Sequence, residues 1–356
     1  MRIVAAMSGG VDSSVVAGLL SEAGHEVVGV TLQLYDTGAA TGRKGACCAG
    51  QDIHDARDVA DRLGIAHYVI DREARFRSAV IDDFADSYAA GETPVPCVRC
   101  NMTVKFTDLL GLAKELGAEA LATGHYVRRL EGEGGAELHR ARDDARDQSW
   151  FLFATTPAQL AFTRFPLGDM PDKAAVRAHA VRLGLAVAEK PDSQDLCFVP
   201  KGRYADLVTS LRPEAGQGGE IVTTDGRVLA RHPGIAGFTV GQSRGLNDAS
   251  FDRGERQSVR AVDARTRRVV VGPRGTGVRR VQLRDMNWLV PPAPVRCAVK
   301  LRAREAPHGA LVTPDVDGGA TVLLDSPALP APGQACVMYA GSRVLGGGFI
   351  AASGPD

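Results

Sequence analysis

Apolar residues in the first third of the chain follow two alternating spacings. Short apolar runs, typical of buried strands, occupy residues 2–7, 25–34 and 66–71. Stretches in which apolar residues recur every three or four positions, as on one face of a helix, occupy residues 11–24, 52–64 and 103–117. Strands that alternate with helices predict βαβ units. We therefore expect an α/β fold that begins with a doubly wound parallel sheet covered by helices on both faces.

The pattern changes twice further along the chain. Residues 130–149 are rich in charge and predict a hairpin or loop, and residues 156–211 have mostly helical periodicity. Beyond Pro213 the helical periodicity disappears, and short β-branched runs lie between Gly and Pro residues, which predicts two small β-rich domains. The expected domains are a first domain at residues 1–155, a helical extension at 156–211, a small β domain at 212–278 and a β-barrel at 279–356.

Composition sets broad limits on the class of protein. The 356 residues are 44% hydrophobic and 24% charged, as in an ordinary globular protein. Lys plus Arg equals Asp plus Glu, 42 each, so a nucleic-acid partner would have to be held by local basic clusters. Clusters that suit phosphate contacts, but that equally suit solvated strand faces, contain Arg265, Arg267, Arg268, Lys300, Arg302 and Arg304.

The apolar runs and the cysteines indicate the cellular compartment of the protein. No apolar run approaches the length of a membrane span, so we expect a cytoplasmic protein with no membrane partner. In a reducing compartment the seven cysteines predict reactive, metal-binding or buried thiols and not a structural disulfide framework. The expected buried bystanders are Cys47, Cys48, Cys297 and Cys336.

The stretch SGGVDSS, Ser8 to Ser14, joins the first expected strand to the first expected helix. Its glycines let the backbone approach an anion, its serines supply hydroxyls, and the helix start supplies free N–H groups. It lacks the lysine and the spacing of the loop that transfers a terminal phosphoryl group. Asp12 would cap the helix or hold Mg²⁺. We expect the loop to share a crevice with the later stretch ATGHY, beyond the carboxyl ends of the strands.

SGGVDSS resembles the PP-loop of the ATP pyrophosphatase superfamily. The resemblance implies cleavage of ATP between its α- and β-phosphates, with the loop gripping the departing pyrophosphate. The superfamily includes GMP, NAD and argininosuccinate synthetases as well as several tRNA sulfur-insertion enzymes. The loop by itself does not choose among them.

Two cysteines lie in contexts that favour chemistry. The stretch TPVPCVRCNMTVKF places Cys100 and Asn101 at the expected start of a helix, where a positive dipole end lowers a thiol pKa. Cys197 lies in the polar stretch EKPDSQDLCFVP and not on an apolar helical face. A sulfur relay needs one thiol to carry a persulfide and another to attack it.

Together with ATGHY, DQSWFLF, FPLG, HPGIAGFTVGQSRGL and PGQACVMYAGSRVLGGGFI, these stretches resemble the tRNA-specific 2-thiouridylase family over nearly the whole chain. The resemblance implies ATP-dependent 2-thiolation of the wobble uridine, position 34, in the tRNAs for Lys, Glu and Gln, through adenylation of O2. It implies Cys100 as nucleophile, Cys197 as the persulfide carrier, and a disulfide between them after transfer. The implied sulfur source is a cysteine desulfurase or a sulfur-relay protein.

The same resemblance implies the binding residues. ATP, with Mg²⁺, would be bound by Ala6, Met7, Ser8, Gly9, Gly10, Val11, Asp12, Ser13, Leu32 and Gly124. The tRNA would contact Val95, Pro96, Cys97, His125, Arg146, Asp147, Gln148, Arg302 and Gln334. An extruded base would stack on an aromatic ring, with Tyr126, Trp150 and Phe198 as candidates.

One departure from the family leaves an alternative open. Many members carry Asn-Pro-Asp where this chain has Val95-Pro96-Cys97, which removes an aspartate and creates the pair Cys97-x-x-Cys100. With Cys197, three thiols would then suit an iron–sulfur cluster or a zinc ion. We favour the persulfide relay and expect no resident metal on these thiols. The other open functions are a PP-loop ligase or amidotransferase and a non-catalytic RNA-binding protein.

Overall fold

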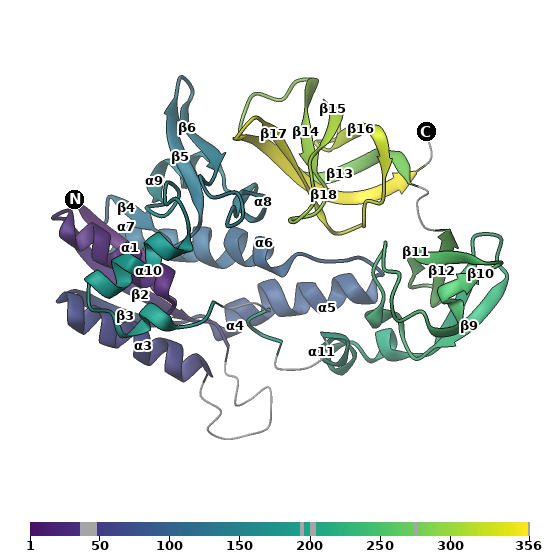
Figure 1. Ribbon diagram of the computed structural model, residues 1–356, viewed down its shortest axis with the longest axis horizontal. Coiled ribbons are helices and arrows are strands. Elements are labelled where there is room, and N and C mark those ends of the chain that lie inside the picture. The colour runs from purple at the N-terminus through teal and green to yellow at the C-terminus, as the bar shows by residue number, and fades with distance from the viewer. Residues whose placement is uncertain (36–47, 193–195, 200–203, 274–276, 355–356) are drawn as a thin grey trace. The chain divides into compact units, whose positions relative to one another are not determined.

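The computed structural model describes residues 1–35, 48–192, 196–199, 204–273 and 277–354 (Figure 1). The chain forms two compact units. The first comprises Met1–Ala79, Cys97–Pro200 and Ser342–Val344, and the second comprises Val80–Pro96, Lys201–Gly341 and Leu345–Asp356. The four expected domains stay a prediction, because these units group the residues more coarsely.

A five-stranded sheet forms the centre of the first unit. Its strands are β1 (Arg2–Ala6), β2 (Glu26–Gln33), β3 (Ala66–Asp71), β4 (Ala120–Ala122) and β7 (Thr163–Arg164), in the order β3-β2-β1-β4-β7. All four neighbouring pairs are parallel. The expected parallel sheet is thus confirmed. Strand β7 lies in the segment expected to be mostly helical, and its two residues are too few to produce a periodic signal.

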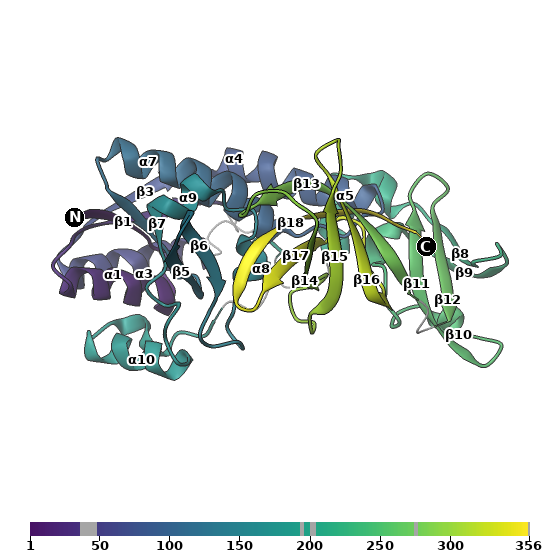
Figure 2. The ribbon, with the colours of Figure 1, turned by 90° about the horizontal axis from the view of Figure 1, so that it is seen from above.

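Helices cover both faces of this sheet. Figure 2 shows α1 (Val11–Glu22) and α3 (Cys48–Leu63) on one side of the strands and α7 (Leu110–Glu115) on the other. Val15 and Val16 of α1 are completely buried in the core that contains Ile3 of β1. Full burial of a valine stabilises the fold by roughly 1.5–3 kcal/mol, so the apolar stripe of α1 fixes it against the sheet.

Shorter elements complete the first unit. Of the hairpin or loop expected for the charged insert at residues 130–149, the structure has a hairpin of β5 (Val127–Gly132) and β6 (Gly135–Arg140). The helices are α4 (Glu73–Phe76), α6 (Pro96–Cys100), α8 (Ser149–Leu152), α9 (Pro157–Phe162) and α10 (Lys173–Arg182), with a 3₁₀ turn at Ala186–Glu189. Two segments are π-helical, Arg77–Ile81 and Asn101–Leu109.

The second unit is mostly β structure, as expected. Beside helices α5 (Asp82–Ala89) and α11 (Tyr204–Leu211), it contains a mixed sheet in the order β10-β11-β12-β8-β9. These strands are β8 (Gly219–Thr223), β9 (Val228–His232), β10 (Phe251–Asp252), β11 (Glu255–Asp263) and β12 (Arg268–Pro273). Short 3₁₀ turns lie at Pro213–Gly216, Ile235–Gly237 and Asn247–Ser250.

The last six strands form the expected barrel. They are β13 (Val278–Trp288), β14 (Val295–Lys300), β15 (His308–Pro314), β16 (Ala320–Ala328), β17 (Ala335–Ala340) and β18 (Arg343–Gly354). Strand β13 pairs with both β16 and β18, which closes the barrel. Val299, Val312 and Val322 fill its interior. In the described part of the chain, no helix combines the length and the apolar character needed to cross a membrane.

Candidate active site

The loop after β1 is held in shape by its own hydroxyl groups. The Ser8 N–H donates to Ser13 Oγ at 3.0 Å, and the hydroxyls of Ser13 and Ser14 donate to the Gly10 carbonyl at 3.1 and 2.9 Å. Gly9 has φ +72°, and a Cβ there would lie 2.1 Å from the Asp52 carbonyl oxygen. Only glycine fits this turn, because both the left-handed conformation and the close contact exclude a side chain.

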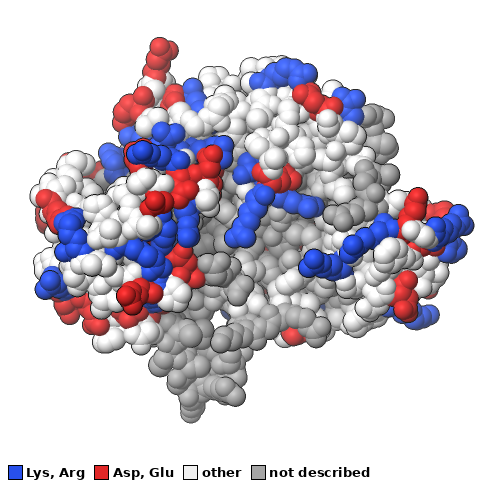
Figure 3. All heavy atoms as spheres, in the orientation of Figure 1, with Lys and Arg blue, Asp and Glu red and all other residues white. Residues whose placement is uncertain are grey.

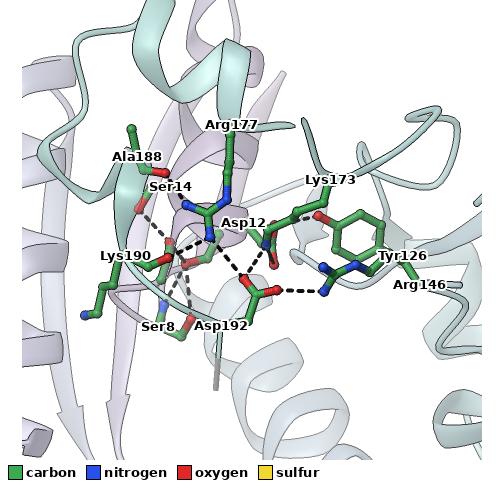
Figure 4. Close-up of polar contacts among 12 residues, drawn as sticks. Ser8, Asp12, Ser14, Tyr126, Arg146, Lys173, Arg177, Ala188, Lys190 and Asp192 are labelled. Carbon is green, nitrogen blue, oxygen red and sulfur yellow. Dashed lines mark hydrogen bonds and ion pairs between the residues drawn. The ribbon is translucent and has the colours of Figure 1, made fainter. Parts of the chain in front are cut away.

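The start of α1 is open to an anion. Gly10 is the N-cap residue and no side chain caps the helix, so the first N–H groups lack an intrahelical acceptor. The prediction that Asp12 caps α1 is wrong, because Asp12 lies inside the first turn. Its carboxylate instead accepts hydrogen bonds from Lys173 Nζ at 2.8 Å and from the Tyr126 hydroxyl at 2.6 Å (Figure 4).

We call Asp12, Tyr126, Arg146, Lys173 and Asp192 the loop charge cluster. Lys173 Nζ also lies 2.7 Å from Asp192 Oδ1, and Arg146 Nη1 lies 2.6 Å from Asp192 Oδ2 (Figure 4). Partial burial by itself would raise the pKa of Asp192, but hydrogen bonds from Lys173 and Arg146 outweigh it and hold the pKa below its usual value. Burial, and then the hydrogen bond to Asp12, raise the pKa of Tyr126.

A second ammonium group reaches the loop from Lys190. Its Nζ donates to the Gly9 carbonyl at 2.9 Å and pairs with Asp52 at 2.6 Å and with Asp55. The loop without a lysine therefore has two lysines beside it, and sequence reasoning missed both. They lie 161 positions from Asp12 and 181 positions from Gly9 along the chain. The sequence did offer one signal: two stretches, FPLGDMPD and EKPDSQDLCFVPKG, interrupt the helical periodicity of residues 156–211. Lys173 directly follows the first stretch, and Lys190 lies in the second.

The structure brings most of the other predicted nucleotide residues to this loop. Ala6 ends β1, and the N–H of Met7, which follows it, donates to the Val30 carbonyl at 2.8 Å. A Cβ on Gly124 would lie 3.0 Å from the Ser13 nitrogen, so Gly124 packs against the start of α1. Leu32 is half-buried near the end of the adjacent strand β2.

The position of Cys100 differs from the prediction. Helix α6 begins at Pro96, where proline suits a helix start, so Cys100 ends α6 and does not begin a helix. The residue is 7% exposed. The expected lowering of its pKa is wrong: burial raises the pKa of Cys100, with a smaller opposing effect of Lys105 and a raising effect of Cys97. The chain then continues without interruption into the π-helical segment.

Cys97 and Cys197 lie near enough to Cys100 for the three thiols to influence one another. Cys97 is exposed, and the protein around its sulfur raises its pKa. Cys197 is also exposed as a residue, but its sulfur is enclosed closely enough for burial to raise its pKa to about 12, followed by the effect of Cys100. No three His, Cys, Asp or Glu residues in the described ranges are arranged to hold a metal ion. The geometry therefore offers no support for an iron–sulfur cluster or zinc.

The predicted tRNA contacts of the first unit are partly engaged within the protein. Asp147 accepts from the Ala141 N–H and the Ser149 hydroxyl, and Gln148 Oε1 accepts from the Tyr126 N–H at 2.9 Å. His125 is half-buried and pairs with Thr123 Oγ1 at 2.9 Å. Burial, and then Lys105, lower the pKa of His125 well below its usual value. Of these predicted contacts, Arg146 is the one that belongs to the loop charge cluster.

The other predicted tRNA contacts are placed as follows. Val95 and Pro96 are buried, Arg302 Nη2 donates to the carbonyls of Val240 and Leu329 at 3.1 Å each, and Gln334 Nε2 donates to the Thr93 carbonyl at 3.1 Å. All four belong to the second unit.

The surface features expected to serve RNA are less open than predicted. Tyr126, Trp150 and Phe198 are all buried, so none offers a free ring in this structure. In the basic clusters, Arg268 pairs with Glu220 at 3.2 Å and Lys300 is buried. On the face in Figure 3, blue and red side chains are interspersed. Of the expected bystander cysteines, Cys336 is buried and Cys297 half-buried; Cys47 and the side chain of Cys48 lie outside the described residues.

Three family models match the chain in series. They are described as tRNA methyl transferase HUP domain over residues 1–201, tRNA methyl transferase PRC-barrel domain over 207–273 and aminomethyltransferase beta-barrel domain over 278–350. The chain is 70% identical over 352 residues to tRNA-specific 2-thiouridylase MnmA of Acidiphilium cryptum, covering 98% of this chain and 100% of the relative. It is 64% identical over 359 residues to the protein of the same name from Gluconobacter oxydans, covering 99% of each. A solved 4-thiouridine synthetase in complex with RNA and ATP aligns with a TM-score of 0.35 at 15% identity, over 60% of this chain and 50% of that one.

Proposed function

The chain belongs to the tRNA-specific 2-thiouridylase family, whose members thiolate tRNA with ATP, and we propose how its residues divide the steps of that reaction. The observation that supports the division is that one unit contains two distinct centres. The loop charge cluster includes Asp12 of the phosphate loop, and the thiols of Cys97, Cys100 and Cys197 form a second group whose members act on one another's pKa.

The phosphate loop serves the adenylation step. The β- and γ-phosphates of ATP bind the N–H groups at the start of α1 and the serine hydroxyls. The uridine O2 attacks the α-phosphorus, forming an O–P bond as the bond to the departing pyrophosphate breaks. Lys173 and Lys190 then exchange carboxylate contacts for phosphate oxygens and stabilise the charge that develops on the leaving group.

Mg²⁺ fits the chemistry of this loop. Asp12 supplies a half-buried carboxylate, the type of oxygen ligand that Mg²⁺ prefers. When bound, the ion would neutralise phosphate charge. Lys173 holds Asp12 in the absence of nucleotide and keeps its carboxylate at the loop.

The thiols serve the sulfur step. Cys197 receives a persulfide from a cysteine desulfurase or sulfur-relay protein. The Cys100 thiolate attacks Cys197 Sγ, the new Cys100–Cys197 bond forms, and the terminal sulfur leaves as hydrosulfide. Hydrosulfide attacks C2 of the adenylated uridine and AMP departs. An external thiol then reduces the disulfide.

The substrate uridine is position 34 of the tRNAs for Lys, Glu and Gln, and the reaction takes place in the cytoplasm. Arg146 belongs to the loop charge cluster and His125 lies within the influence of Lys105; they are the contacts of the first unit that best suit an RNA phosphate or base. The further contacts are Val95, Pro96, Cys97, Asp147, Gln148, Arg302 and Gln334.

A reconstituted reaction tests the proposal. Purified protein is incubated with ATP, Mg²⁺, a persulfide donor and unmodified tRNA; AMP is measured, and 2-thiouridine is sought by mass spectrometry of the digested tRNA. We expect both products, and none when S-adenosylmethionine replaces ATP and the donor. AMP without 2-thiouridine would favour a ligase, and tRNA retention without AMP would favour a non-catalytic RNA-binding protein.

Serine variants of the two cysteines test their roles. Cys197→Ser and Cys100→Ser should each lower thiolation at least about 10³-fold, because each removes a sulfur that forms a covalent bond. The control is Cys297→Ser, a half-buried thiol in the barrel, with thiolation near wild type. Labelled sulfane sulfur should load Cys100→Ser but not Cys197→Ser. Full activity in either active-site variant would refute the relay.

A further inference from the structure

A π-helical segment lies directly after Cys100. It spans Asn101–Leu109, and the Thr107 hydroxyl donates to the Met102 carbonyl, five residues earlier, at 2.7 Å. In an α-helix a side chain five residues on points about 140° away, since each residue turns about 100°. In a π-helix the i to i+5 pairing brings such residues onto one face. The residue five positions after Cys100 is Lys105, so this local winding places the lysine nearer to the helix face of Cys100 than an α-helix would.

The positive charge of Lys105 affects the pKa of all three cysteines. It lowers the pKa of Cys97, of Cys100 and of Cys197, in each case against a larger raising effect of burial. Among the described residues it is the only cation that acts on all three. Its ammonium also has no carboxylate within ion-pair distance in the described part of the chain, whereas Lys173 and Lys190 each have two.

Sulfur transfer between Cys197 and Cys100 needs such a cation. The attacking group is a thiolate, and the leaving group is hydrosulfide, so one negative charge moves from Cys100 to the terminal sulfur while the total charge stays the same. No oxidant is needed, since the persulfide S–S bond breaks as the disulfide forms. Burial disfavours the negative charge on Cys100 before the transfer and on the terminal sulfur after it. A cation whose charge acts on all three sulfurs offsets part of that penalty throughout.

We propose that Lys105 is a positioning residue that holds the negative charge on sulfur during the transfer from Cys197 to Cys100. This inference rests on the proposed roles of those two cysteines. Lys105 forms no bond to sulfur and takes no proton; it acts through its charge and through the π-helical winding that directs it to Cys100.

The test measures thiol ionisation separately from catalysis. The rate of Cys100 alkylation by iodoacetamide is followed from about pH 6 to about pH 11 by peptide mass spectrometry in the full-length protein, without ATP or tRNA. Lys105→Met and Lys105→Gln should raise the apparent pKa of Cys100 by about one unit, and Lys105→Arg should restore it toward wild type. Lys114→Met is the matched control: Lys114 is exposed on the following helix, over the Phe162 ring.

The same variants are then loaded with persulfide, and hydrosulfide release is measured. We expect release near neutral pH to fall about tenfold in Lys105→Met and Lys105→Gln, to recover in Lys105→Arg and to stay unchanged in Lys114→Met. Alkylation profiles of Lys105→Met and Lys105→Gln that superimpose on wild type would overturn the role of Lys105. A shifted profile with wild-type hydrosulfide release would also overturn it. Failure of Cys100→Ser to affect thiolation would instead refute the relay itself.

Discussion

The phosphate loop and the thiol group of the first unit differ in how their lysines are paired. At the phosphate loop, Lys173 and Lys190 each contact two carboxylates, so charge is balanced before any ligand arrives. At the thiols, the charge of Lys105 acts on three sulfur atoms, with no carboxylate partner among the described residues. The difference follows from the ligand. ATP arrives already charged and needs cations that can exchange partners, whereas a thiol must acquire its charge inside the protein and needs a cation that stays.

Lys173→Met should produce the largest difference between the two centres. It removes a cation from the polyphosphate site and leaves Asp12 without its ion pair, while Asp192 keeps only its contacts with arginines. AMP formation should fall about 10²–10³-fold, as when one preorganised donor to a developing charge is lost. Alkylation of Cys100 should remain as in wild type. Equal losses in both assays would show that the two centres are not independent.

Gly9→Ala should damage the loop alone. The added Cβ meets the Asp52 carbonyl at 2.1 Å and requires a left-handed conformation at φ +72°, so we expect a loss of roughly 2–4 kcal/mol in stability and much weaker ATP binding. Gly24→Ala is the matched control, since Gly24 has φ +78° and a methyl group added there would have nothing within 4 Å. It should cost only about 1 kcal/mol. Thermal unfolding and nucleotide titration measure both effects.

Acid should weaken the loop charge cluster by a smaller amount. The pKa of Asp192 in the folded protein is below its usual value, so the carboxylate contributes stability above the unfolded pKa of about 4, and this contribution is lost as the pH falls through the lower folded value. Asp192→Asn should lower the melting temperature at neutral pH by an amount equivalent to about 1 kcal/mol, and the difference should shrink below about pH 4. Asp169→Asn is the control, because Asp169 is exposed. A difference in melting temperature between Asp192→Asn and wild type that grows in acid would contradict the lowered pKa of Asp192.

Local patterns predicted the fold well because the elements concerned are long and periodic. The strands around the loop, helix α1 and the end of α3 at Gly64, with φ +67°, follow from apolar spacing and a terminal glycine. The short β-branched runs predicted the β-rich second unit, whereas closure of its barrel depends on the pairing of β13 with β18. Strand β7 was not predicted, because two residues are too few to show a periodic pattern. Its pairing with β4 in the sheet makes these residues a strand.

The site was predictable in its parts and not in its contacts. SGGVDSS indicates a phosphate loop, but the partners of Asp12 come from residues 114 and 161 positions away, and no local rule connects such positions. The expectation for Cys100 failed for a local reason: Pro96 starts the helix four residues earlier, so burial and not a helix dipole determines the thiol pKa. The π-helical winding also leaves no signature in residue types.

The winding after Cys100 makes chain length itself part of the active site. A π-helix differs from an α-helix by an inserted residue per turn. Deleting a single residue after Lys105 within this segment would keep both side chains and the interval between them, yet would favour an α-helix, in which residues five apart point about 140° from each other. A comparison of relatives that scores identities alone would count such a deletion as one lost residue. Transplanting this segment into another protein would therefore require the full length of the π-helix as well as the cysteines, because the inserted residue determines the direction of Lys105.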